Sequence, residues 1–446
     1  MTSIGEARTG RRSATWALAL WSAALLAAGL AVMAALYALF GADRPAVATR
    51  TAVEEAAARE ERIAFFEARA AADPLDYLSL NVLATQYMQR ARETGDVADY
   101  RRAEAAAATS LELAPQDNYA GLINMASVRL VQHDFAAAAL RGREAMALKP
   151  NEAAPYGLLA DAMVGVGQYD KASDLLASAV EVEAGLPVLS RLAHLAFLRG
   201  DEFNAVDFWR QAIDRGEGLP QENLAWAHVQ LGETYFAAGE LSKAAREHEA
   251  ALEGYPDYAP GLAGLGRVRA AQLRFDDAID LYLRAVARLP RPQYVSALGD
   301  VYAVLGRQAE AEEQYALVEA IAGLYRSNGI NTDLEIAAYY ADHDIEPELA
   351  LEMARAAYEA APGVYAADAL AWALYRNGRY EEAATYSAEA TALGTPEPSF
   401  YYHAALVSEA LGDTRTALEY SRRLGELNPR FSPLHAQRAL QLAEAQ

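Results

Sequence analysis

The chain has 446 residues, of which 53% are hydrophobic, so it can bury a large core and is not a disordered tail. Its formal net charge of −22 argues against general nucleic-acid binding, because phosphates attract basic patches, and it favours cationic partners. The absence of cysteine excludes disulfides, thiolate metal sites and cysteine nucleophiles.

The first element in the chain is an apolar segment, residues 14–41, which contains no charged side chain. It is longer than the roughly 20 residues that cross a bilayer as a helix, so we expect a transmembrane helix. Arg8, Arg11 and Arg12 in the leading tail, residues 1–13, would keep that tail in the cytoplasm. The remainder of the chain is then expected outside the cytoplasmic membrane, in the periplasm or beyond the cell. We assume a bacterial cell because alanine is abundant and lysine is rare.

A cleaved signal peptide is the alternative interpretation of this segment. The small-residue pattern Ala46-Val47-Ala48 is typical of a cleavage site, and cleavage would leave an exported, soluble periplasmic protein. A secretory apolar core is usually about 7 to 15 residues, however, which is shorter than the segment found here. Residues 42–72 follow as a charged, alanine-rich helix, either a stalk or a cover for the element after it.

The body of the chain repeats itself every 34 residues. Aligning the stretch that begins at Leu231 with the one that begins at Leu265 pairs Gly232 with Gly266, Ala244 with Ala278 and Pro256 with Pro290. About ten units follow this period over residues 73–430. Residues 431–446 have the pattern of a terminal helix that solvates the last unit.

These residues resemble the tetratricopeptide repeat (TPR) family, whose unit is a pair of antiparallel helices. Leu231, Gly232, Tyr235 and Ala244 carry the resemblance in the best unit, and later units repeat it. The resemblance implies an all-α fold, a right-handed superhelical solenoid of about ten helix-turn-helix repeats, preceded here by the transmembrane helix. The small residues are expected where helices cross closely.

The resemblance also implies which side chains line the inner wall of the superhelix, since the first helix of each unit faces inward. Transferring the family's groove positions by register predicts eight partner-binding residues: Trp226, Glu233, Tyr339, Tyr365, Asp368, Trp372, Tyr375 and Tyr402. Aromatic and acidic side chains suit a peptide with basic or apolar side chains. Packing between units is the other interpretation of the tyrosines. A carboxylate clamp needs lysines on first helices, and the three lysines Lys149, Lys171 and Lys243 all fall on second helices or at their ends, so we expect no such clamp.

Catalytic patterns are absent from the sequence. There is no HExxH, no Gly-rich phosphate loop and no GxSxG, and the seven histidines are dispersed. Only His343 with Asp342, Asp344 and Glu346 groups side chains that could bind a cation, and we interpret it as a polar turn. We therefore expect no cofactor and no enzyme, but a membrane-anchored scaffold or adaptor for envelope assembly. A hydrolase or transferase in the groove is a remote alternative.

Overall fold

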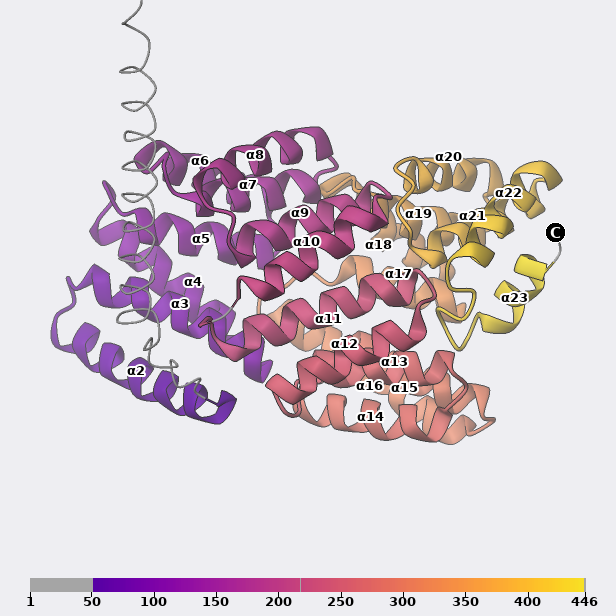
Figure 1. Cartoon of the computed structure of the whole chain (residues 1–446), viewed down its shortest axis with the longest axis horizontal. Coiled ribbons are helices and arrows are strands. Elements are labelled where there is room, and N and C mark those ends of the chain that lie inside the picture. The colour runs from indigo at the N-terminus through magenta and orange to yellow at the C-terminus, as the bar shows by residue number, and fades with distance from the viewer. Residues whose placement is uncertain (1–50, 217, 445–446) are drawn as a thin grey trace, which may run out of the picture. The chain divides into compact units, whose positions relative to one another are not determined.

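The computed structural model describes residues 51–216 and 218–444 (Figure 1). These residues form 22 helices and no strand, which confirms the all-α prediction. The predicted cytoplasmic tail and transmembrane helix, and the first residues of the predicted stalk, lie outside the described residues. Among the helices that are described, none is both long and apolar enough to cross a membrane.

Twenty of the helices pair into ten antiparallel hairpins. The first helices of the hairpins are α3 Tyr77–Thr94, α5 Tyr119–Val131, α7 Ala153–Gly165, α9 Leu186–Leu198, α11 Gln221–Ala237, α13 Ala259–Ala271, α15 Pro292–Val304, α17 Asp333–His343, α19 Val364–Arg376 and α21 Pro398–Ala410. The second helices are α4 Ala98–Leu113, α6 Phe135–Leu148, α8 Tyr169–Val182, α10 Glu202–Asp214, α12 Leu241–Gly254, α14 Phe275–Arg288, α16 Gln308–Ser327, α18 Pro347–Ala360, α20 Tyr380–Thr391 and α22 Thr414–Glu426. Helix α2 Ala52–Ala72 precedes the hairpins and α23 Ala436–Glu444 follows them.

Small residues allow the helices of this array to cross closely, as the 34-residue period predicts. Ala244, Ala278 and Ala311 are each 0% exposed at the start of a second helix. A larger side chain at these positions would separate the helices and leave voids beside it. The turn inside the ninth hairpin is formed by Gly378 with φ +69°, a conformation that glycine adopts without a steric penalty.

The superhelix closes on itself after six hairpins. The turn between the two helices of one hairpin lies against the loop that leads into a hairpin six positions later in the chain, so the third hairpin meets the ninth and the fourth meets the tenth. Thus the Val364 N–H donates to the Tyr169 hydroxyl at 3.0 Å, and the Thr395 Oγ1 donates to the Leu198 carbonyl at 2.6 Å. The same spacing brings Asn428 to Phe236, where its Nδ2 donates to the backbone carbonyl at 3.0 Å. Successive turns of the superhelix therefore touch at these positions.

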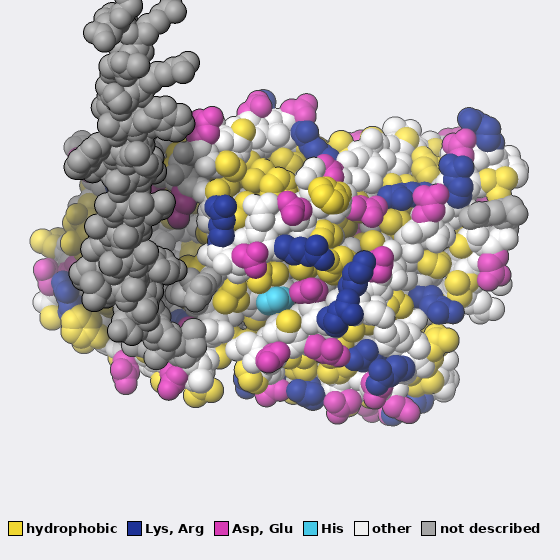
Figure 2. Space-filling view, in the orientation of Figure 1, with side chains coloured by type: hydrophobic (Ala, Val, Ile, Leu, Met, Phe, Trp, Pro, Cys, Tyr) yellow, Lys and Arg dark blue, Asp and Glu magenta, His cyan; other side chains and the backbone are white. Residues whose placement is uncertain are grey.

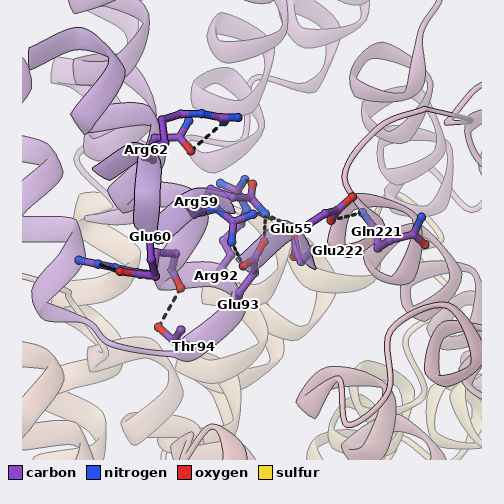
Figure 3. A network of polar contacts seen from close by, with 12 residues as sticks. Glu55, Arg59, Glu60, Arg62, Arg92, Glu93, Thr94, Gln221 and Glu222 are labelled. Atoms are coloured by element: carbon purple, nitrogen blue, oxygen red, sulfur yellow. Dashed lines mark hydrogen bonds and ion pairs between the residues drawn. The ribbon is translucent and has the colours of Figure 1, made fainter. Parts of the chain in front are cut away.

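Helix α2 joins this closure at the N-terminal end. It starts with a capping box at Thr51 and packs on α3 through Ile63, which is 3% exposed. Arg59 pairs with Glu93 of α3 in a site that excludes solvent. At the other edge, the carboxylate of Glu55 accepts the N–H of Gln221 at 2.9 Å, at the start of α11 (Figure 3). Helix α2 thus bridges the first and fifth hairpins.

Candidate functional site

A cavity of about 700 Å³ lies inside the superhelix, where the first helices of four hairpins surround it. Trp226 of α11, Arg267 of α13, Tyr294 of α15 and Tyr339 of α17 line it. Arg92 and Tyr100 of the first hairpin complete one side, and residues 431–433, after the last hairpin, complete another. Because its walls come from parts of the chain more than 300 residues apart, the cavity exists only when the superhelix is closed.

Two smaller hollows adjoin this main cavity. One, of about 560 Å³, lies along α7, α9 and α11 and shares Trp226 and Gln230 with the main cavity. The other, of about 120 Å³, shares Gln230, Glu233 and Arg267 and reaches Tyr365. Gln230 lines all three hollows, so together they form one interior space.

Most charged side chains of the interior are neutralised by partners within the chain. Glu222 accepts hydrogen bonds from the Tyr258 hydroxyl at 2.9 Å and from Arg92 Nε at 3.4 Å. Glu233 forms an ion pair with Arg267. On the outside, Figure 2 shows charged side chains of both signs mixed across the visible face. The interior therefore has little net charge to offer a ligand, although the whole chain is strongly acidic.

The smallest hollow contains two ionisable groups whose charged forms are disfavoured. Burial raises the pKa of Glu397 above its ordinary value, although Arg267 opposes the shift. Burial also lowers the pKa of His194, which lines the same hollow. Both shifts have the sign expected where many protein atoms surround an ionisable group.

Four of the eight predicted partner-binding residues line the interior. Trp226, Glu233 and Tyr339 line the main cavity, and Tyr365, 40% exposed, lines the smallest hollow. The Trp226 ring is held edge-on to Trp209 at 5.4 Å. The register of the repeats therefore identifies the helix faces that point inward.

The other four predicted residues belong to a packed aromatic cluster beside the cavity. Trp372 is 2% exposed, with its ring stacked between Tyr375 at 4.9 Å and His403 at 4.2 Å. Tyr402 is 4% exposed, and Asp368 is buried against His403 with a distance of 3.0 Å to Nδ1. Partner contact by Trp372, Tyr375, Tyr402 and Asp368 stays a prediction that this burial does not favour.

The chain's own C-terminal segment explains this burial. His435 stacks on Tyr402 at 5.0 Å, and its Nε2 lies 3.1 Å from the Asp342 carboxylate. Trp372 Nε1 donates to the same carboxylate at 2.9 Å. Burial alone would raise the pKa of Asp342, but His435 lowers it below its ordinary value. Residues that follow the last repeat thus cover part of the inner faces of the last three hairpins, which the repeat register predicts to be free for a partner.

His343 does not form the cation site that its acidic neighbours could suggest. Its Nε2 lies 2.8 Å from Asp300 and its Nδ1 lies 2.8 Å from the Tyr339 carbonyl. Burial lowers its pKa, but the Asp300 carboxylate more than reverses this, so the pKa lies above its ordinary value. Within residues 51–216 and 218–444, no three acidic or histidine side chains gather as a metal site.

The 34-residue repeat does not predict that several of the lining residues face the cavity. Arg92 and Tyr100 belong to the first hairpin, Arg291 belongs to a loop between hairpins, and Phe431 follows the last hairpin. Only Arg291 is marked in the sequence, by the prolines on either side of it. The others enter the site through the closure of the superhelix, which the sequence does not reveal.

The fold defines a helical-repeat protein with an internal cavity. No family model matches the sequence, and no curated protein is similar to it. The ten hairpins with their small crossing residues give this chain a TPR-like helical repeat fold. Solved structures that match it include proteins described as TPR proteins.

Three of these structures illustrate the similarity. The human IFIT1 dimer with PPP-AAAA has 14% identity and a TM-score of 0.45 over 86% of this chain and 94% of its own. MamA has 19% identity and a TM-score of 0.30 over 37% of this chain and 94% of its own. YrrB, described as a TPR protein with an unusual peptide-binding site, has 18% identity and a TM-score of 0.29 over 42% and 95%. At these identities and TM-scores, no property of these proteins transfers to the site of this chain.

Proposed function

We propose that this protein is a binding scaffold that holds a peptide, or an extended segment of a protein, inside its closed superhelix. The main cavity of about 700 Å³ has the size of a ligand pocket, and a folded domain cannot enter it. The observation that carries the proposal is an aromatic wall built from Trp226, Tyr258, Tyr294 and Tyr339 around largely neutralised charges. Such a wall favours apolar and aromatic side chains.

The preference for basic side chains that the sequence suggests has less support. Glu233 is already paired with Arg267, and Asp368 with His403. A basic ligand would have to displace these partners, which costs the free energy of two existing charge pairs. We therefore propose an apolar or aromatic ligand over a basic one.

We further propose that residues 14–41 anchor the protein in a bacterial cytoplasmic membrane, with the solenoid on the outer side, where it serves envelope assembly. The length and charge pattern of the segment support this proposal. Mass spectrometry of the mature N-terminus tests it. An intact N-terminus in the membrane fraction is expected, whereas a chain that begins after Ala48 would replace the anchor with a cleaved signal peptide.

A cavity-filling variant tests the binding proposal. Ala297 lines the main cavity on α15, so Ala297→Trp should fill it, whereas Ala287→Trp places the same ring on an exposed position of α14. Both full-length variants are used to capture partners from an envelope fraction of the host. We expect the wild type and Ala287→Trp to retain a partner that Ala297→Trp loses. Equal capture by both variants would place the binding surface outside the cavity.

A further inference from the structure

Arg291 lies in the main cavity at a position that the backbone holds firmly. It follows Pro290 and precedes Pro292, so its backbone is restricted to the extended conformation found here, with φ −105° and ψ 145°. Leu289, two residues before Arg291, is 3% exposed, and its side chain packs directly on Gly95 of the first hairpin. The loop is thus anchored on both sides before the Arg291 side chain enters the cavity.

The guanidinium of Arg291 lacks the charged partner that other arginines of this wall have. Arg92 is paired with Glu222 and Arg267 with Glu233. Among the described residues, no carboxylate lies within 4.0 Å of Arg291. The groups that face it are tyrosine hydroxyls and rings, and the Tyr294 ring centre lies 5.9 Å from the guanidinium.

This arrangement is suited to a single anionic group on a ligand. Guanidinium groups bind carboxylates through two parallel hydrogen bonds, and these bonds are stronger away from bulk water. Tyr100 and Tyr294 line the same part of the cavity and can donate further hydrogen bonds. The N-terminus of α15 begins at the next residue, Pro292, and its helix dipole favours negative charge there.

The remaining charges of the cavity select among anions. Glu222, Glu335, Asp300 and Asp342 line the same space together with Glu233, so a polyphosphate would meet more carboxylates than arginines among the described residues. A ligand with one negative charge avoids most of this repulsion. The charge pattern therefore favours one carboxylate over a nucleic-acid backbone.

We infer that Arg291 binds a carboxylate of the peptide that occupies the main cavity, either at the C-terminus of the peptide or on an acidic side chain. This inference rests on the proposed function and adds the ligand chemistry to it. It also assigns a partner to Arg291, which has no ion pair with any residue that the structure describes.

Peptide pools that differ in one charge test the inference. The full chain is dialysed against N-acetylated random pentapeptides without Asp or Glu, prepared with a free C-terminal carboxylate or with an amide. A third pool is amidated and contains one internal Glu. Mass spectrometry measures what is retained. The variants are Arg291→Gln and Arg291→Lys, with Arg288→Gln as control because Arg288 is exposed and lies outside the cavity.

We expect the wild type and Arg288→Gln to retain a carboxylate pool about tenfold over the amide pool, and Arg291→Gln to lose this preference. Arg291→Lys should keep part of it because the charge remains. Preference for the free-acid pool identifies a C-terminal carboxylate, and preference for the Glu pool identifies a side chain; either result supports the inference.

Other outcomes overturn the inference in distinguishable ways. Equal retention of all pools by the wild type, with loss of all in Ala297→Trp, refutes the carboxylate contact and leaves the binding function standing. No retention of any pool refutes both. Retention of a short RNA oligonucleotide that depends on Arg291 would show that the cavity takes a polyphosphate, and this too refutes the inference.

Discussion

Replacing Gly264 with alanine tests whether the helices pack as closely as the repeat pattern requires. Gly264 of α13 faces the ring of His248 of α12, which is 0% exposed. A Cβ atom at Gly264 would lie 2.2 Å from His248 Cε1. The buried ring has no open side to move toward, because Gly232 also touches it, with a hypothetical Cβ 2.8 Å away. Helices α11, α12 and α13 would have to separate.

The expected magnitude follows from two opposing effects. Overpacking of this kind costs about 1 to 3 kcal/mol of unfolding free energy. Replacing a helical glycine with alanine returns about 1 kcal/mol by reducing backbone entropy in the unfolded chain. The matched control is Gly266→Ala in the same helix, where the new Cβ would lie 3.4 Å from the Tyr282 ring, an ordinary contact. We expect Gly264→Ala to be less stable than Gly266→Ala by about 1 to 3 kcal/mol.

Hydrogen exchange of amides in α12 and α13 is the suitable assay, because repeat arrays open locally and a single global unfolding free energy is poorly defined. Exchange should accelerate in Gly264→Ala and not in Gly266→Ala. Adding His248→Ala to Gly264→Ala should relieve the clash, so the double variant should be more stable than the two separate losses predict. Equal protection in Gly264→Ala and Gly266→Ala would refute the close packing described here.

Three further predictions concern other parts of the fold. Burial lowers the pKa of His403, but the Asp368 carboxylate more than reverses this, so the pKa lies above its value in the unfolded chain. The His403–Asp368 pair therefore stabilises the fold fully below the unfolded pKa, and this stabilisation is lost as pH rises through the folded pKa. The difference in melting temperature between wild type and His403→Gln should shrink from pH 5.5 to 8. Trp372→Ala should lose about 3 to 5 kcal/mol, measured by hydrogen exchange in α19, because its ring is 2% exposed; a variant as stable as wild type would contradict the packing. Leu273 has φ +62° and is 57% exposed, so Leu273→Gly should gain about 1 kcal/mol in chemical denaturation, whereas Leu283→Gly within α14 should lose about as much.

Much of the local structure could be predicted from the sequence because its causes are local. The 34-residue period places a small residue at each helix crossing, as Ala244 and Ala278 show, and their burial requires no information from outside the repeat. The same period places Trp226 and Tyr339 on helix faces that line the main cavity, and their contact with a partner stays a prediction. The handedness of the superhelix stays a prediction.

The closure of the superhelix could not be predicted, because it depends on small rotations that accumulate over six hairpins. No feature near Tyr169 indicates that its hydroxyl meets the N–H of Val364. The positions of Arg92 and Tyr100 in the cavity follow from the same closure. The fold-back of the C-terminal segment was also missed, since the sequence around His435 carries only an amphipathic helix pattern.

Photocross-linking from inside the superhelix tests the central claim most directly. Gln230 lines all three hollows, whereas Leu283 of α14 is 47% exposed and lines none of them. A benzophenone side chain is introduced at each position in turn in the full chain, in cells of the host. If the closed superhelix holds a peptide ligand, a discrete cross-linked partner should form from Gln230 and not from Leu283. Cross-links that form only from Leu283, or equally from both positions, would contradict an interior binding site.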